Sequence, residues 1–178
     1  MLVYHATIAT SDDYLERRAK HRQAHLDRIV GLRAKGLVVG GGPAPDGRMA
    51  EIFYQAQERS AVIRLVEEDP YYLARAWTTY TLRVFTEFIG PLELPPLVID
   101  GSRRVTLVEG AALQVDKANL ALIALRGAGR LGFGGFFEGG ATLALLTTAN
   151  AAEALGWLAE TGFWKEGSFI SRPFLYVL

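Results

Sequence analysis

The fold is decided by two stretches of similar pattern: GRMAEIFYQAQERSAVIRLVEEDPYYLARAWTTYTLRV at residues 47–84 and GGATLALLTTANAAEALGWLAETGFWKEGSFISRPFLY at residues 139–176. Each begins with a glycine and continues with an apolar run of strand character. A segment of helical periodicity follows, and each stretch ends in a run rich in aromatic and β-branched residues. Both stretches therefore predict a strand, a helix and a strand in the same order.

A shift of 92 residues places the first stretch on the second. Gly47 then falls on Gly139, and the pair Tyr71-Tyr72 falls on Phe163-Trp164. Upstream, Gly36 matches Gly129 at a shift of 93. A near-constant offset through loops and elements indicates an internal duplication; two unrelated α+β halves are the alternative.

The rest of each half completes a β-α-β-β-α-β order, the ferredoxin-like arrangement. In the first half we expect strands at 2–9, 37–40, 49–57 and 77–87, and helices at 12–35 and 60–68. In the second half we expect strands at 104–107, 142–147 and 170–178, and helices at 115–127 and 151–160, with a glycine-rich stretch at 133–140 that resembles the loop at 40–47.

These elements predict an α+β protein of two ferredoxin-like repeats. Residues 1–89 form the first repeat, 90–101 a proline-rich linker, and 102–178 the second repeat. A βαββαβ unit covers one face of its sheet with helices and leaves the other face to be buried. We therefore expect the two repeats to pack as an intrachain pseudo-dimer, an α+β barrel; further association into homo-oligomers stays open.

Composition excludes several classes of function. Lysine plus arginine equals aspartate plus glutamate at 19 each, so no net charge attracts nucleic acid or an anionic membrane. There is no cysteine, which excludes disulfides and thiolate chemistry. The sequence begins without the pattern of a signal peptide and contains no apolar run long enough to span a membrane. We expect a cytoplasmic protein.

The three histidines, His5, His21 and His25, all lie in the first half. His21 and His25 are four residues apart on one face of the predicted first helix, a spacing that can hold a metal ion. No third ligand is evident nearby, so we expect no metal site. Two partly exposed histidines on a basic helix are the simpler interpretation.

A set of short motifs in the first half is more specific. The order is Arg22-x-x-His25-Leu26, Gly36-Leu37-Val38, Gly42-Pro43 and Glu68-Asp69-Pro70-Tyr71. In this order and spacing, residues 1–88 resemble the YCII-related family of small α+β proteins. The resemblance implies a ferredoxin-like fold that pairs into an α+β barrel. It also implies an active site in which His25 meets Asp69, with no cofactor. A few similar proteins eliminate chloride from chlorinated, hydroxylated aromatic rings with this pair.

The chemistry of a histidine–aspartate pair agrees with this role. A carboxylate that accepts from one imidazole nitrogen fixes the tautomer and raises the basicity of the other nitrogen. General base catalysis of this kind contributes about 10²–10⁴ in rate. Two alternatives stay open: Asp69 only shapes the Asp-Pro turn, and His25 is a satisfied histidine at the edge of the apolar helix face.

Other residues of the first half are candidates for substrate binding. Arg22 would attract an anionic or phenolate substrate. Gly42 and Pro43 end a glycine-rich loop that lacks the pattern of a dinucleotide site and would form a pocket wall, and Tyr71 would line the pocket. The related proteins usually have a small residue near Arg75, so the pocket mouth is expected to differ here.

The second half keeps the scaffold but not these residues. It has Ala118 where the first half has His25, and Thr161-Gly162 where the first half has Asp69-Pro70. We therefore expect one site per chain, serving a cofactor-independent lyase or isomerase that acts on a small aromatic or anionic substrate. The competing hypotheses are a non-catalytic module that binds a small ligand, and an assembly protein without a working site.

Overall fold

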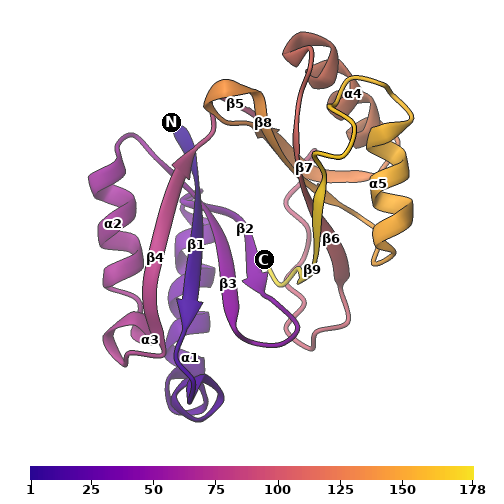
Figure 1. Ribbon diagram of the computed structural model, residues 1–178. Helices are drawn as coiled ribbons and strands as arrows, with labels where there is room; N and C mark the ends of the chain where they lie inside the picture. The colour runs from indigo at the N-terminus through magenta and orange to yellow at the C-terminus, as the bar shows by residue number, and fades with distance from the viewer. The chain divides into compact units, whose positions relative to one another are not determined.

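The computed structural model describes all residues from Met1 to Leu178, and the chain forms two compact units (Figure 1). The first unit contains Met1–Val84 together with Val177–Leu178, and the second contains Phe85–Tyr176. Each unit has its own antiparallel sheet.

The first unit has the predicted β-α-β-β-α-β order with one additional short helix. Its elements are β1 (Leu2–Thr10), α1 (Tyr14–Ala34), β2 (Val38–Pro43), β3 (Met49–Ala56), α2 (Arg59–Glu67), α3 (Pro70–Leu73) and β4 (Trp77–Val84). The strand order in the sheet is β2-β3-β1-β4.

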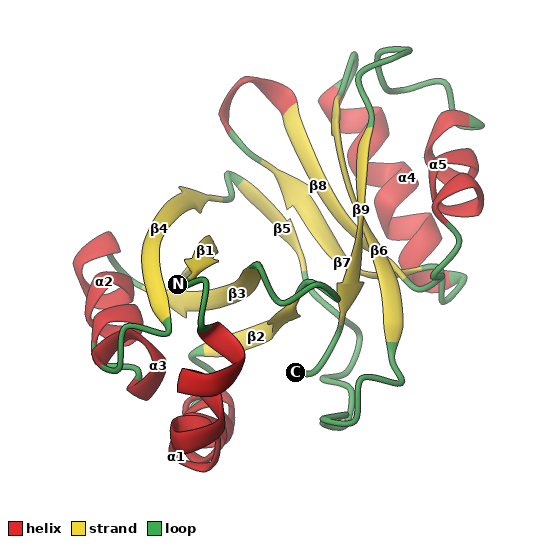
Figure 2. Ribbon diagram, turned by 60° about the horizontal axis from the view of Figure 1, so that its bottom comes forward, coloured by secondary structure: helices red, strands yellow, loops and turns green.

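Alternation along the strands places the core of this unit between the sheet and its helices. Tyr4, Ala6 and Ile8 of β1 are buried in one cluster with Ile29 of α1 and Val66 of α2. Successive side chains of a strand point to opposite faces, so these even-numbered residues of β1 define the face that the helices cover. Figure 2 shows the helices of this unit on one side of its strands.

The second unit repeats this architecture and adds an edge strand. Its elements are β5 (Glu87–Ile89), β6 (Arg104–Ala111), α4 (Val115–Gly127), β7 (Leu131–Phe136), a 3-10 turn (Glu138–Gly140), β8 (Ala141–Leu146), α5 (Ala151–Ala159) and β9 (Ile170–Leu175). The strand order is β5-β7-β8-β6-β9, which is the order of the first sheet with β5 beside β7. Leu122 of α4 and Leu158 of α5 pack against Val108 and Leu146 of the sheet.

The element bounds agree with the duplication. Adding 92 to the bounds of α2 gives those of α5, and adding 93 to the bounds of β2 gives those of β7. The matched glycines also share a conformation. Gly36 and Gly129 have φ values of 70° and 72°, and Gly47 and Gly139 have values of 70° and 77°. These are left-handed conformations that favour glycine, so the same turn chemistry recurs in both copies.

Two details differ from the sequence-based expectation. The predicted strand at 77–87 is two strands, and β5 pairs with β7, so the second unit begins at Phe85 rather than after residue 89. The first half of each glycine-rich stretch is strand and not loop, since Gly42 lies in β2 and Gly135 in β7. A Cβ atom on Gly135 would lie 2.1 Å from the carbonyl oxygen of Glu87, which explains why glycine stands beside β5.

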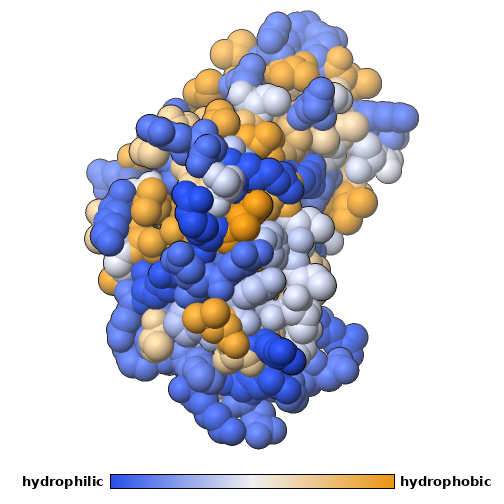
Figure 3. Space-filling view, turned by 90° about the vertical axis from the view of Figure 1, so that its left-hand side faces the viewer, coloured by the Kyte–Doolittle hydropathy of each residue, from blue (hydrophilic) through white to orange (hydrophobic).

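No helix is both long and apolar enough to cross a membrane. Figure 3 looks onto the side on which α2 lies in Figure 1 and shows a mainly hydrophilic surface there, with hydrophobic residues in small separate groups. Leu15 and Leu73 are exposed hydrophobic residues of the first unit. Scattered apolar side chains of this kind are ordinary on a protein surface.

The backbone conformation of Arg75 predicts how a substitution there changes stability. It directly follows Ala74, the C-cap of α3, and is the one non-glycine residue with positive φ, at 56°. Because this conformation strains a residue with a Cβ atom, we expect Arg75→Gly to raise the free energy of unfolding by about 0.5–1 kcal/mol. Urea denaturation measures the change. Arg75→Ala keeps the strain and serves as the control; equal stabilisation by both variants would contradict the explanation.

Candidate active site

The structure brings His25 and Asp69 into direct contact. His25 lies in the middle of α1, and Asp69 is the N-cap of α3. The Nδ1 atom of His25 lies 2.8 Å from Oδ1 and 3.0 Å from Oδ2 of Asp69. A carboxylate only accepts hydrogen bonds, so Nδ1 is the donor. The remaining ring nitrogen, Nε2, is then free of a proton in the neutral ring and can act as a base.

Local sequence fixes the position of the Asp69 carboxylate. Asp69 has extended backbone angles and Pro70 occupies the first helical position, which is the favoured start of a helix. Oδ1 of Asp69 accepts from the backbone N–H of Tyr71 at 2.9 Å. Asp69 has no exposed surface, whereas the side chain of His25 is 14% exposed. The pair therefore has a buried acceptor and a histidine that reaches the surface.

Aromatic rings hold the imidazole in one plane. The ring of Tyr71 stacks on that of His25 with centroids 4.0 Å apart and an angle of 12° between planes. The ring of Trp77 meets the same imidazole edge-on at 5.3 Å. Tyr14 in turn lies edge-on to Tyr71 at 6.0 Å. These contacts restrict the rotation of His25 about its side-chain bonds.

Two arginines of α1 lie on the same side of the helix as the pair. Arg18 stands one turn after Tyr14, and its guanidinium lies 5.8 Å from the ring centroid of Tyr14. Burial raises the pKa of Tyr71 to about 12, while the charges of Arg18 and Arg22 act in the opposite direction. The same two arginines oppose the rise that burial causes in the pKa of Tyr14. Arg18 and Arg22 thus place positive charge beside the tyrosine hydroxyls.

Two buried donors near the pair have no hydrogen-bond partner within the protein: Oη of Tyr54 and Nε1 of Trp77. Burial raises the pKa of Tyr54 well above its usual range, and the Asp69 carboxylate raises it further. A buried polar group without a partner costs free energy, so such groups concentrate where water or a ligand binds.

The other predicted binding residues are placed differently. Tyr71 and Arg22 lie at the pair, as described. Gly42 and Pro43 lie on β2, the edge strand opposite β4, which carries Trp77. Three strand spacings separate these edges, about 14 Å. No hydrogen bond or ring contact joins Gly42 or Pro43 to His25 or Asp69, so the structure does not bring them together with the pair.

The structure contains a second histidine–carboxylate pair that was not predicted from the sequence. Nε2 of His5 in β1 lies 2.5 Å from Oε2 of Glu51 in β3, and both residues are buried. The His5 ring stacks on Phe53 at 4.9 Å. Both residues occupy odd-numbered strand positions, on the face opposite the helices. An acidic residue inside the apolar run 50–54 was the available signal.

The second unit separates the structural role of Asp69 from its contact with histidine. Thr161 occupies the position of Asp69, and its hydroxyl accepts from the backbone N–H of Phe163 at 3.4 Å. This repeats the bond from Tyr71 to Asp69. Ala118, at the position of His25, is fully buried in α4. The turn is therefore capped in both units, but only the first unit adds a carboxylate–imidazole contact.

No group of three or more histidine, cysteine, aspartate or glutamate side chains is arranged to hold a metal ion. His25 contacts a carboxylate and two aromatic rings, and this arrangement can transfer a proton at Nε2.

Comparison with solved structures shows the class of fold. A monooxygenase-like protein from Lactobacillus acidophilus NCFM matches 98% of this chain and 93% of its own, at 12% identity and a TM-score of 0.64. A chlorite dismutase-like protein matches 100% of this chain and 96% of its own, at 11% identity and a TM-score of 0.53. These neighbours belong to the ferredoxin-like, dimeric α+β barrel class. The predicted fold class, an α+β protein of tandem ferredoxin-like repeats, is confirmed.

One half of the chain matches a family model. Residues 2–86 match the YCII-related domain, so the resemblance that the sequence motifs indicate for the first half is confirmed. A 5-chloro-2-hydroxyhydroquinone dehydrochlorinase from Burkholderia phenoliruptrix AC1100, solved with 2,5-dihydroxybenzoquinone, matches 45% of this chain and 89% of its own at 20% identity and a TM-score of 0.41. Among curated proteins, none matches the chain.

The tyrosines of the site predict how stability depends on pH. Unfolded tyrosine ionises near pKa 10, whereas in the folded protein the pKa of Tyr71 is raised to about 12. Above pH 10 the unfolded state therefore binds fewer protons, and the free energy of unfolding should fall as pH rises toward 12. Tyr71→Phe and Tyr54→Phe should each flatten this fall in urea denaturation between pH 9 and 11.5. An unchanged slope in both variants would contradict the assigned burial.

Proposed function

We propose that the first unit is a cofactor-independent enzyme of the lyase or isomerase type, in which His25 exchanges protons with a small hydroxylated aromatic substrate. The observation that carries the proposal is the contact of His25 Nδ1 with both oxygens of the fully buried Asp69. This contact leaves Nε2 as the reactive nitrogen. The match of residues 2–86 to the YCII-related domain supports a small-molecule site in this unit.

The buried carboxylate would help His25 in both directions of proton transfer. When Nε2 takes a proton, the imidazolium gains a charged hydrogen bond to Asp69. When the proton is returned, the same bond keeps the ring in the tautomer that presents a bare Nε2. The stacked Tyr71 ring holds the imidazole in place throughout, which lowers the entropic cost of reaction.

The positive charges near His25 and Asp69 indicate the class of substrate that this site would bind. Arg18 and Arg22 lie near the hydroxyl ends of Tyr14 and Tyr71. Positive charge there would stabilise a phenolate or a carboxylate, and the aromatic side chains would contact a flat ring. Gly42 and Pro43 are not part of this proposed contact surface.

The proposed reaction on a chlorinated hydroxyhydroquinone consumes no oxidant. One hydroxyl becomes a ketone as its proton is lost and the carbon that bears chlorine gains a proton. Loss of a second hydroxyl proton to His25 then forms another carbonyl, and chloride leaves with the electron pair of the C–Cl bond. The products are a hydroxybenzoquinone, chloride and a proton. Without a leaving group, the first step alone is an isomerisation.

Asp69→Thr is the sharpest test, because it copies Thr161 of the second unit. Threonine should keep the cap on the Tyr71 N–H and so preserve the fold, while it removes the charged partner of His25. We expect turnover of a chlorinated hydroxyhydroquinone, measured as chloride release, to fall by about 10²–10⁴. His25→Ala should give a similar loss.

The matched control is His21→Ala, one turn before His25 on the same helix, which should leave chloride release unchanged. Turnover of Asp69→Thr within tenfold of the unmodified protein would contradict the proposal. Binding of the aromatic probe that survives in His25→Ala, with no turnover in any form of the protein, would instead favour a non-catalytic binding module.

Arg22→Gln tests the proposed role of positive charge. If Arg22 binds the anionic substrate in its ground state, KM should rise by about tenfold with little change in kcat. Lys20→Gln removes an exposed positive charge from the same helix and serves as the control. A fall in kcat with unchanged KM would show that Arg22 does not act in substrate binding.

A further inference from the structure

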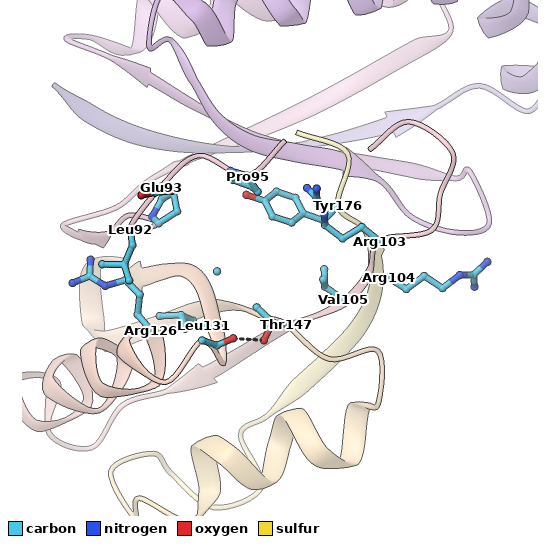
Figure 4. A pocket seen from close by; sticks show the side chains of 13 residues that line it. Leu92, Glu93, Pro95, Arg103, Arg104, Val105, Arg126, Leu131, Thr147 and Tyr176 are labelled. Carbon is cyan, nitrogen blue, oxygen red and sulfur yellow. Dashed lines mark hydrogen bonds between the residues drawn. The ribbon is translucent and has the colours of Figure 1, made fainter. Parts of the chain in front are cut away.

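Exposed large apolar side chains of the second unit fall into two main groups. One group lies on the segment 91–99, where Leu92 and Pro95 border a cavity between this segment and the sheet of the same unit (Figure 4). The other group lies at α4. Here Leu113 is 62% exposed, Leu120 67% and Ile123 41%. Apolar side chains gathered on one helix mark a surface that a partner covers.

The exposed leucine and isoleucine of α4 lie on the side of the helix that faces away from the sheet. Ala118, Leu122 and Leu125 of α4 are buried in the core of the second unit. At 3.6 residues per turn, the opposite side of the helix carries one continuous row of exposed residues. This outer stripe of α4 consists of Asp116, Leu120, Ile123, Ala124 and Gly127.

The first unit shows that the fold does not require apolar side chains here. At a shift of 93 residues, Leu113 and Leu120 correspond to Lys20 and Asp27, which are exposed on α1. Each exposed leucine forgoes the free energy that burial of its side chain would supply. Because charged residues serve at the same positions of the first unit, the leucines of the second unit indicate a function in association.

The charges around the outer stripe have opposite signs at its two ends. Asp116 is the one charged residue of the stripe, and the neighbouring Lys117 lies over the ring of Phe163 at 5.9 Å. Beyond Gly127 the next charged residue is Arg130, which is exposed and lies over the ring of Trp157 at 5.2 Å. An identical stripe laid antiparallel would therefore bring each carboxylate toward a guanidinium.

From this pattern we infer that the outer stripe of α4 binds a second copy of the chain, with the two α4 helices antiparallel about a two-fold axis beside Ala121 and Leu122. Leu120 of each copy then packs against Ala124 of the other, and the small side chain of Ala124 lets the helices approach closely. Asp116 of each copy lies toward Arg130 of the other. Every contact occurs twice, as two-fold symmetry requires.

The interface is independent of the function proposed for the first unit, and its size indicates a weak dimer. The chain carries no net charge, so two copies do not repel each other. A helix of the length of α4 extends only about 20 Å. One pair of such helices buries less than the roughly 1,600 Å² of a standard interface, so we expect a dissociation constant in the micromolar range.

Sedimentation of the full chain over a range of concentrations tests the inference. We expect monomers at low micromolar concentration and dimers at several hundred micromolar. Leu120→Glu places two like charges beside the axis and should raise the dissociation constant at least about tenfold. The matched control is Leu15→Glu on α1. Leu15 is 69% exposed, nearly the same as Leu120, and this variant should leave the dissociation constant unchanged.

Single cysteines test the antiparallel arrangement, because the chain has no cysteine of its own. Leu120→Cys lies near the axis, so mild oxidation of the dimer should join two copies by a disulfide. Leu113→Cys lies far from the axis and meets residues near Arg130 of the second copy. Its two thiols are then much more than the roughly 7 Å apart that a disulfide allows between Cα atoms. This variant should cross-link at least about tenfold more slowly.

Three outcomes would overturn the inference. A chain that stays monomeric at several hundred micromolar would show that a second copy does not cover the stripe. Dimers that survive in Leu120→Glu, with the affinity of the unmodified chain, would place the interface elsewhere. Equal rates of cross-linking at positions 113 and 120 would contradict the antiparallel arrangement, because in a parallel pair each residue meets its own counterpart.

Discussion

The burial of the Asp69 carboxylate is the constraint on which the first unit depends. Removing a carboxylate completely from water costs several kcal/mol unless donors replace the water. Here the donors are the Tyr71 N–H and Nδ1 of His25. The first comes from α3 and the second from α1, so the two helices must keep a fixed register. The stacking of Tyr71 on His25 is a consequence of the same register, because Tyr71 is the residue whose N–H the carboxylate caps.

Comparison of the two units shows which part of this arrangement the fold requires. The turn after α5 needs an acceptor for the N–H of Phe163, and the uncharged hydroxyl of Thr161 supplies it. Ala118 fills the space of His25 with an apolar side chain. The same backbone is therefore stable without a buried charge at this corner. In the first unit the carboxylate and the imidazole go beyond what the turn requires, which agrees with the role proposed for this pair.

The sequence predicted the structure well where a local pattern is compatible with only one kind of secondary structure. Helical periodicity located α2 and α5 to within one residue at each end. The short helix α3 after the Asp-Pro pair was not predicted. The prediction from sequence failed where one type of residue occurs in two kinds of structure. Glycine is common in turns, but in β7 it allows β5 to approach closely, so a strand was predicted as a loop. The contact of His5 with Glu51 joins two strands far apart in sequence, and no local pattern encodes such a pairing.

The contact between His25 and Asp69 was predictable from the sequence, but the residues around the pair were not. His25 and Asp69 were identified through a motif, whereas Tyr14 and Arg18 were missed because nothing marks them individually. Their role follows from helix geometry, since residues 14, 18, 22 and 25 succeed one another at intervals of three or four on one face of α1. One helix thus carries the ring that supports Tyr71, the positive charges and the imidazole. A rotation of α1 about its axis would displace all of them together, and the hydrogen bond to Asp69 opposes it together with the burial of Ile29 and Leu32 in the core.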